Sequence, residues 1–219
     1  MAFVELLFFA FLSTASASEN VKSANVGIIG GHTITIEQVP FMISLRLNGT
    51  YHWCGGSIIH ERFILTAAHC IIANREFKVA VGTDQIDNGG QVYDIEKIIP
   101  HEQYSSKTQD NDICLIKLTK PIVFGPTVAK IELADETLKL RKKNILAITG
   151  WGNTTPTGHV AKHLLQVDIP VVSRPVCQRI YFGLRRQLTP RMICAGGNGK
   201  DSCQVYFKIY INLSNIISF

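Results

Sequence analysis

The feature that most constrains the fold is a succession of short, strand-like segments separated by turn residues. Phe41–Leu47 alternates apolar and polar residues, and Asn48-Gly49 after it predicts a hairpin into Tyr51–Cys54. Strands at this spacing indicate an all-β sandwich or a pair of barrels. The other predicted strands are Ser57–Ile59, Phe63–Ala67, Phe77–Val81, Gln91–Ile99, Ile113–Leu118, Asn144–Thr149 and Leu164–Val171.

A single helix is predicted among these strands. Ser173 can cap it, Pro175 suits its first turn, and apolar residues recur at helical spacing over Val176–Leu184. Gly183 limits the helix at its C-terminal end. The stretch around Leu118–Leu140 is linker-like, and it lies between two groups of strands. It is therefore predicted to join these two groups into one unit.

Composition supports a folded core and excludes several kinds of partner. Of the 219 residues, 46% are hydrophobic and 18% are charged, which excludes a disordered chain. The net charge is +5, and its densest clusters, Arg141–Lys143 and Arg185–Arg186, are short enough to be solvated faces, so no nucleic-acid partner is expected. No apolar run reaches the roughly 18 residues of a membrane span, so no membrane partner is expected.

The N-terminal segment Met1–Ala17 is interpreted as a secretory signal peptide. Phe3–Leu12 is nearly all apolar, and Ala15-Ser16-Ala17 supplies the small-x-small cleavage pattern that would leave Ser18 first. The alternative is a buried strand or an anchor. An extracellular location is therefore expected, and it permits disulfide bonds.

The six cysteines do not form a recognisable metal site. No Cys-x-x-Cys pair and no Cys/His spacing of the zinc-finger kind is present, and many disulfide connectivities stay open on residue positions alone. The segment Thr83–Gln91 contains Asp84 and Asp87 but no Glu, so a calcium loop is not expected either. We expect no metal and no cofactor.

Several short motifs carry the chemistry, and their order matters more than any one of them. A lone histidine such as His69 in Thr66–Cys70 is more often structural than catalytic. Here it follows Ile28-Ile29-Gly30-Gly31 and precedes Asp110–Leu115, Gly150-Trp151-Gly152 and Cys194–Gln204. The ordered set resembles the trypsin branch of the chymotrypsin-like serine proteases from Ile28 to Gln204.

The resemblance implies an all-β fold, the chymotrypsin-like double β-barrel, and peptide hydrolysis after Lys or Arg. His69 would be the general base and acid, since an imidazole titrates near neutral pH. Asp112 would fix the tautomer of His69, although a turn or capping Asp is the alternative. Asp201 would be the substrate-binding carboxylate that pairs with Lys or Arg, with an ordinary loop Asp as the alternative.

The resemblance also implies disulfide pairs. Cys54–Cys70 would clamp the His69 loop, and Cys177–Cys194 would tie the helix to the wall of the specificity pocket. Cys114 is expected to be a buried thiol. Cys203, which the family pairs with a later cysteine, has none after it in this sequence and would be reactive or intermolecular.

The sequence departs from the family immediately after Gln204. There the family continues Gly-Asp-Ser-Gly-Gly-Pro. Here Val205 takes the slot of the oxyanion-hole glycine, Tyr206 that of the Asp that pairs with the new N-terminus, and Phe207 that of the nucleophilic serine. Because phenylalanine cannot attack a carbonyl, the chain as written is predicted to be inactive.

Residues 205–219 are interpreted as a tail outside the family pattern. The first barrel is expected to be complete and the second incomplete, with the tail supplying one substitute strand. The tail is rich in β-branched and aromatic residues and looks aggregation-prone alone. Many residues of the tail are encoded by AT-rich codons, and the codon of Val205 can begin with GT, the dinucleotide that opens nearly all introns. We therefore hypothesise that the tail arises from intron read-through after Gln204. A short splice form and a diverged homologue are the alternatives, which sequencing the transcript beside the genomic DNA separates.

The expected activation N-terminus is Ile28, which divides the chain into a signal peptide (1–17), a propeptide (18–27), a protease domain (28–204) and the tail (205–219). Zymogens of the family are cut after Lys or Arg, but Gly27 precedes Ile28 and Lys22 is the nearest basic residue. Either another protease acts or activation is lost, unless the propeptide is unusual but harmless.

These observations leave three functional hypotheses. The first is a secreted trypsin-like endopeptidase whose partners are protein or peptide substrates with Lys or Arg, and protease inhibitors, and which is a monomer. The second is a non-catalytic homologue that acts as a binding or decoy protein. The third is that no stable protein forms. Retention of His69, Asp112 and Asp201 argues against long non-catalytic evolution.

Overall fold

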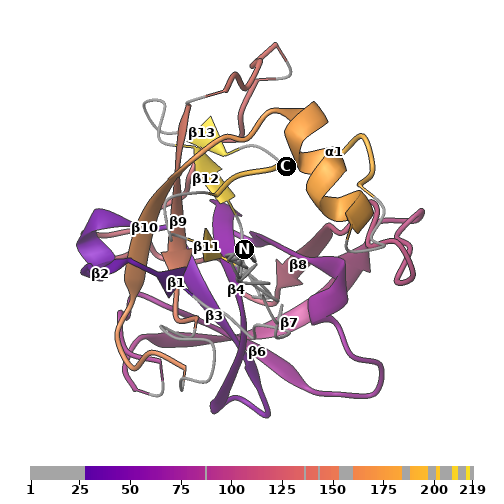
Figure 1. The fold of residues 1–219 in the computed structure, drawn as a ribbon. Coiled ribbons are helices and arrows are strands. Elements are labelled where there is room, and N and C mark those ends of the chain that lie inside the picture. The colour runs from indigo at the N-terminus through magenta and orange to yellow at the C-terminus, as the bar shows by residue number, and fades with distance from the viewer. Residues whose placement is uncertain are drawn as a thin grey trace, which may run out of the picture.

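The structure of the chain is a computed structural model, drawn in Figure 1. It describes residues 28–86, 88–135, 137–142, 144–152, 160–183 and 188–196, with the backbone alone at 29, 201–202, 209–211 and 216–217. The expected signal peptide and propeptide, Cys203 and Val205–Phe207 lie outside the described residues.

Six antiparallel strands close into a barrel in the order β3-β4-β5-β8-β7-β6 (Figure 1). Inward and outward residues alternate, most clearly in β8, where every second side chain is buried. The interior is filled by branched apolar side chains such as Ile43, Ile58, Val79 and Ile116, each fully buried. The strands are β3 (Met42–Leu47), β4 (Tyr51–His60), β5 (Phe63–Thr66), β6 (Phe77–Val81), β7 (Gln91–Pro100) and β8 (Cys114–Leu118).

A second unit contains a five-stranded sheet in the order β13-β12-β9-β10-β2. A short pair, β1 with β11, forms a separate two-stranded sheet, and its Ile28 packs against Leu146 and Leu165 of the five-stranded sheet. The tail contributes β12, which pairs with β9. Among the described residues the five-stranded sheet is open. Its strands are β2 (His32–Thr33), β9 (Ile145–Gly150), β10 (Leu165–Pro170), β12 (Ile209–Ile211) and β13 (Ile216–Ile217). The separate pair consists of β1 (Ile28–Ile29) and β11 (Asp201–Ser202).

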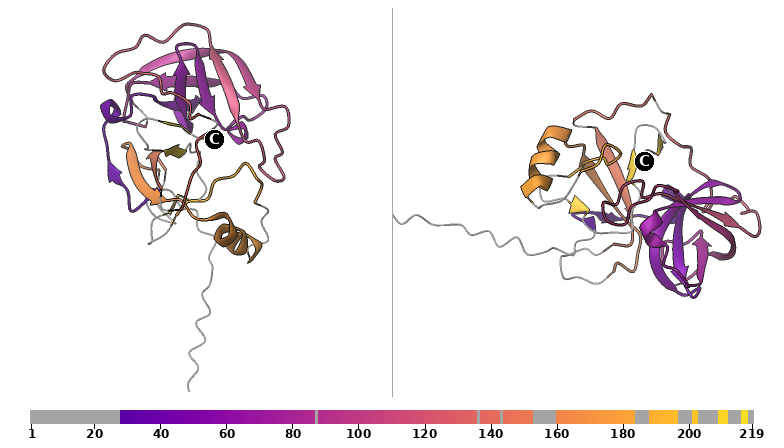
Figure 2. Two further views of the ribbon diagram at one scale, coloured as in Figure 1. Left: turned by 90° about the horizontal axis from the view of Figure 1, so that it is seen from above. Right: turned by 90° about the vertical axis from the view of Figure 1, so that its right-hand side faces the viewer.

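The two units lie side by side, as the right-hand view of Figure 2 shows. Trp151 and Leu164 of the second unit pack in one cluster with Met42 of the barrel and with Ile34 and Ile36. Ile36 belongs to the short 3₁₀ helix η1 (Ile36–Gln38). The mostly β architecture with two β units confirms the predicted fold class.

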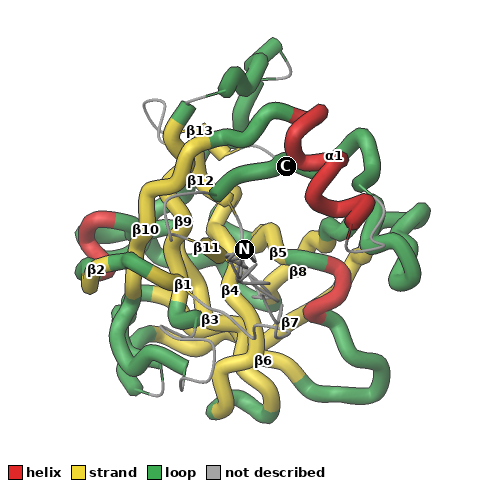
Figure 3. Tube along the Cα trace, viewed as in Figure 1, coloured by secondary structure: helices red, strands yellow, loops and turns green. Residues whose placement is uncertain are grey.

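The predicted helix is α1, Arg174–Gly183, which carries Pro175 in its first turn and ends at Gly183. Figure 3 shows how little other helix accompanies it, namely the short turns η1 and η2 (Ala68–Cys70). Among the described residues, no helix has the length and apolar character needed to cross a membrane.

The Asn48-Gly49 hairpin prediction is confirmed. Both residues adopt left-handed backbone angles, with φ of 52° and 77°, which is the conformation that Asn and Gly tolerate best. The turn joins β3 to β4, and Leu47 pairs with Tyr51 across it.

The prediction of separate strands at Tyr51–Cys54 and Ser57–Ile59 is wrong, because β4 runs without a break through Gly55-Gly56. A Cβ atom on Gly56 would lie 2.9 Å from the carbonyl oxygen of Leu65 and 3.0 Å from the Ile43 side chain. The glycine therefore permits close packing inside the barrel instead of marking a turn.

The linker-like stretch around Leu118–Leu140 is more tightly packed than expected. The backbone amides of Ala129 and Ile131 donate to the carbonyls of Pro40 and Ile58. Ile122, Val128 and Ile131 are buried. The segment therefore joins the two units as part of their packed surface.

His52 on β4 lies where the two units meet. Its Nδ1 is 2.7 Å from the Ser44 hydroxyl, and its ring meets Trp151 edge-on with centroids 5.1 Å apart. Trp151 in turn donates from Nε1 to the carbonyl of Asp84. Burial, with the charge of Arg46 as a second cause, lowers the pKa of His52 to about 4.

We expect His52 to make stability pH-dependent. The folded-state pKa of about 4 lies below the ordinary value of 6.5, so the unfolded chain binds the proton first. The stability that the neutral His52 ring contributes is fully present above pH 6.5 and is lost as the pH falls toward about 4. This contribution to the free energy of unfolding is at most about 3 kcal/mol. Urea unfolding at neutral and acidic pH measures it.

His52→Gln should flatten this pH dependence, whereas the control His101→Gln, at an exposed histidine, should retain it. Equal slopes in the parent chain and in His52→Gln would contradict the assignment.

Candidate active site

His69 is held in the turn that follows β5. It sits in η2, whose Cys70 is joined to Cys54 of β4 by a disulfide with an S–S distance of 2.06 Å. The indole of Trp53 donates to the carbonyl oxygen of Cys70 at 2.8 Å. The disulfide and this hydrogen bond fix the backbone on the C-terminal side of His69.

Asp112 approaches the same point from the loop before β8. Its carboxylate accepts the backbone N–H of His69 at 2.8 Å and lies 2.5 Å from Nδ1 of the ring, across 43 residues of sequence. The two side chains are 27% and 21% exposed, so solvent and a ligand can still reach the ring. The structure therefore brings together two residues that the sequence singles out.

This geometry assigns the ring nitrogens. Because an ionised carboxylate only accepts, Nδ1 carries the hydrogen in this contact, and Nε2 is the nitrogen that can exchange a proton with a reacting group. Burial raises the pKa of Asp112, but hydrogen bonds from the side chain and backbone of His69 outweigh it and hold that pKa below its usual value. Asp112 thus stays ionised and can stabilise a protonated His69.

Tyr104 borders the pair from the loop between β7 and β8. Burial first, and then the negative charge of Asp112, raises the pKa of its hydroxyl. The phenol therefore stays neutral near physiological pH and adds no second negative charge beside Asp112.

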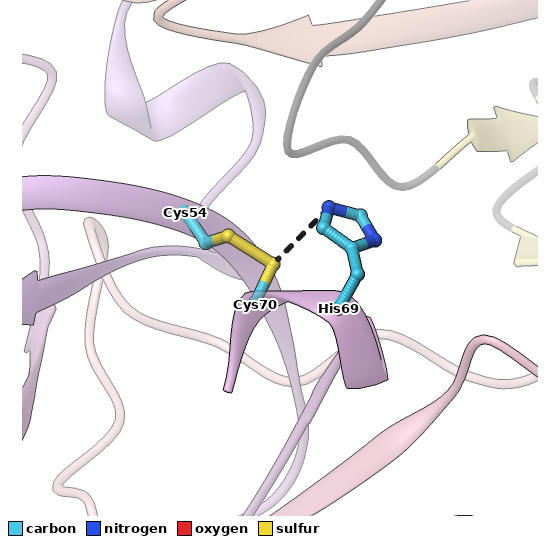
Figure 4. A group of neighbouring side chains, drawn as sticks. All are labelled: Cys54, His69 and Cys70. Carbon is cyan, nitrogen blue, oxygen red and sulfur yellow. Dashed lines mark hydrogen bonds between the residues drawn. A yellow bond between two sulfur atoms is a disulfide. The ribbon is translucent and has the colours of Figure 1, made fainter. Parts of the chain in front are cut away.

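The disulfide next to His69 also bears on metal binding. Figure 4 shows Cys54, Cys70 and His69, with Nε2 of His69 3.7 Å from Sγ of Cys70. Their potential ligand atoms lie within 4.8 Å of one another. Both sulfurs, however, are bonded in the disulfide, and a cysteine binds zinc only as a thiolate. In this oxidised state the cluster does not offer a metal the donors it needs.

The remaining predicted site residues belong to the second unit. The Ile28 side chain is buried, and β1 pairs with β11 so that Ile29 lies opposite Asp201. The side chain of Asp201 lies outside the described residues. The disulfide Cys177–Cys194 ties α1 to the segment that leads toward Asp201.

Two further residues, Cys114 and Trp53, lie close to the His69–Asp112 pair in the chain or in the fold. Cys114, at the start of β8, is buried, with its Sγ 3.5 Å from the carbonyl of Leu115. Trp53, which holds the Cys70 carbonyl, was not predicted, because its position beside Cys54 carries no sequence signal for that contact.

Comparison with known proteins agrees with this arrangement. The family model described as Trypsin matches residues 28–205. The chain belongs to the trypsin family. This membership confirms the resemblance read from the ordered motifs, and trypsin-family proteases act on protein substrates.

The chain is similar to several curated members of the family. It is 32% identical to a vitellin-degrading protease of Bombyx mori over 91% of this chain and 76% of that protein. It is 34% identical to Trypsin 5G1 of Aedes aegypti over 84% of this chain and 70% of that protein. It is 38% identical to anionic trypsin of Bos taurus over 91% of this chain and 78% of that protein.

Replacing both cysteines of Cys54–Cys70 by alanine should lower the free energy of unfolding more than the same change at Cys177–Cys194. The sequence separations of 16 and 17 are nearly equal, so each loop loses a similar constraint of about 3 kcal/mol. Both Cys54 and Cys70 are buried, whereas in the other disulfide Cys177 is buried and Cys194 is only partly so, so replacement of the first pair leaves the larger cavity.

Urea unfolding of both double variants measures the difference. An equal or greater loss at Cys177–Cys194 would show that burial around Cys54–Cys70 adds nothing to the loop constraint.

Proposed function

We propose that the chain represents a secreted trypsin-like serine endopeptidase that cleaves after Lys or Arg, and that the polypeptide as written does not hydrolyse peptide bonds. The observation that carries the family activity is the His69–Asp112 pair, with Nδ1 and the carboxylate 2.5 Å apart. The proposed domain boundaries, activation N-terminus and extracellular location are those set out above. Two disulfides accord with an oxidising compartment.

In the proposed reaction, Nε2 of His69 accepts the proton of an attacking hydroxyl and returns it to the leaving amine. Asp112 keeps the ring in the required tautomer and stabilises the imidazolium that forms between these steps. Asp201 would pair with the Lys or Arg side chain of the substrate, since a carboxylate at the base of a pocket selects a cation.

The proposed inactivity rests on the residues after Gln204. Phe207 has no hydroxyl to deprotonate, so His69 has no nucleophile to activate in the expected slot. Val205 in place of the family glycine also alters the expected oxyanion-binding backbone. The acid–base pair alone does not form an acyl-enzyme.

The full chain should acquire no covalent adduct from an aryl phosphonate that carries an Arg-like side chain. Mass spectrometry of the intact protein measures labelling, and an Arg-amide substrate measures turnover, with anionic trypsin as the positive control. The rate should equal that of His69→Gln. One stoichiometric adduct that disappears in His69→Gln would overturn the proposed inactivity.

A second candidate function is a non-catalytic binding or decoy protein. Its support is that the His69–Asp112 pair and both disulfides are formed, whereas the sequence has Phe207 where the family has serine. A folded site without a nucleophile can hold a ligand and leave it uncut.

This candidate predicts that a Kunitz-type inhibitor with Lys or Arg at its pocket-entering position binds the full chain. Asp201→Asn should weaken binding by at least about tenfold, because the ligand cation loses its charged partner. Asp135→Asn, which removes the same charge at an exposed position, should bind as the parent does. Absence of binding, or an equal loss in both variants, would refute the binding role; isothermal titration calorimetry measures it.

A further inference from the structure

The loop that carries Asp112 is joined to the second unit at Asp110. The Asp110 carboxylate accepts a hydrogen bond from the Thr189 hydroxyl at 2.7 Å and one from Nε of Arg191 at 2.9 Å. Its other oxygen accepts from Nη2 of Arg191. Arg191 therefore grips the carboxylate with two donors, 81 residues away in the sequence. We call Asp110, Thr189 and Arg191 the cross-unit clamp.

The backbone around Asp110 is in a conformation that local contacts alone do not favour. Gln109 and Asn111, the residues on either side, have φ of 56° and 53°. This left-handed region is tolerated by Asn but is uncommon for Gln. Such a conformation persists when surrounding contacts hold it in place. Hydrogen bonds from the Ser105 amide to the Asp110 carbonyl and from the Asn111 side chain to the Gln103 carbonyl supply part of that hold.

The segment that carries Thr189 and Arg191 is itself held against α1. The guanidinium of Arg174, in the first turn of α1, donates to the backbone carbonyls of Thr189, Pro190 and Met192. The disulfide Cys177–Cys194 then joins α1 to the end of the same segment. In Figure 1 the loop between β7 and β8 reaches the side of the molecule where α1 lies.

The clamp differs from an ordinary surface ion pair in its geometry and in the burial of its acceptor. The Asp110 side chain is only 16% exposed and Thr189 is buried, whereas the Arg191 side chain is 57% exposed. Hydrogen bonds from Arg191 and then Thr189 lower the pKa of Asp110 to about 2. The carboxylate therefore stays charged at neutral pH.

We propose that Arg191 and Thr189 are positioning residues for the His69–Asp112 pair, because they hold Asp110 and so fix the backbone that delivers Asp112 to Nδ1 of His69. Only one residue separates Asp110 from Asp112, and the Ile113 amide donates to the carbonyl of the intervening Asn111. A shift of the Asp110 side chain is thus passed directly to Asp112. The second unit contributes to the geometry of an acid–base pair that lies wholly on the barrel.

This inference rests on the His69–Asp112 pair of the proposed function but not on hydrolysis. Its readout is the hydrogen bond itself, so a failure of the proposed peptidase activity and a failure of the clamp give separate results. A purely structural ion pair would change global stability and leave that hydrogen bond as it was.

The test follows the low-field proton resonance of the His69 Nδ1–H in the full chain labelled with ¹⁵N-histidine. Disappearance of the resonance in His69→Gln assigns it. Arg191→Ala and Asp110→Asn should each accelerate exchange of this proton with solvent by about tenfold or more, since a charge-assisted hydrogen bond is weakened when its acceptor is displaced. Arg191→Lys retains the charge but not the two-donor geometry, so its exchange rate should lie between the rates of these variants and that of the parent chain.

The matched control is Lys78→Ala. It breaks an exposed ion pair within the barrel, in which Nζ of Lys78 lies 2.9 Å from the Asp94 carboxylate, and it should leave the exchange rate unchanged. Thr189→Val removes one donor at nearly constant volume and serves if Arg191→Ala does not fold. Unchanged exchange in the folded clamp variants, or equal acceleration in Lys78→Ala, would overturn the proposal.

Discussion

The hydrogen bond between His69 and Asp112 depends on one pairing of strands. β5 and β8 run antiparallel, with Thr66 opposite Cys114. The chain leaving β5 and the chain entering β8 therefore meet at the same end of the barrel. His69 follows three residues after Thr66 and Asp112 precedes Cys114 by two. Closure of the barrel thus converts a separation of 43 residues into a contact of 2.5 Å.

The barrel alone does not set the directions of the two side chains, and each is fixed by a separate covalent or polar restraint. The Cys54–Cys70 disulfide anchors η2 to β4 on the His69 side. On the Asp112 side the restraint is a set of hydrogen bonds that Thr189 and Arg191 of the second unit donate to Asp110. A disulfide resists local opening more firmly than hydrogen bonds do. Asp112 is therefore the partner whose placement depends more on the second unit.

The sequence predicts those features that have a local cause. Alternating residues and Asn48-Gly49 are sufficient for the β3–β4 hairpin, and the ordered motifs are sufficient for the fold class. The break predicted within β4 failed because glycine marks both turns and close packing, and only the Ile43 and Leu65 neighbours distinguish the two. The contact of Asp110 with Arg191 has no local signal, since it exists only once both units are folded.

The division of the site between the units bears on the departure after Gln204. The strands that position His69 and Asp112 all end by Leu118, and the disulfide beside His69 joins β4 to η2 before that point. Residues 205–207 come after all of these elements in the sequence, and Phe207 stands there where the family has serine. The clamp also closes before that point, at Arg191. Every described contact that positions His69 and Asp112 therefore comes from a residue before the departure, so these contacts do not require the serine that the family has there.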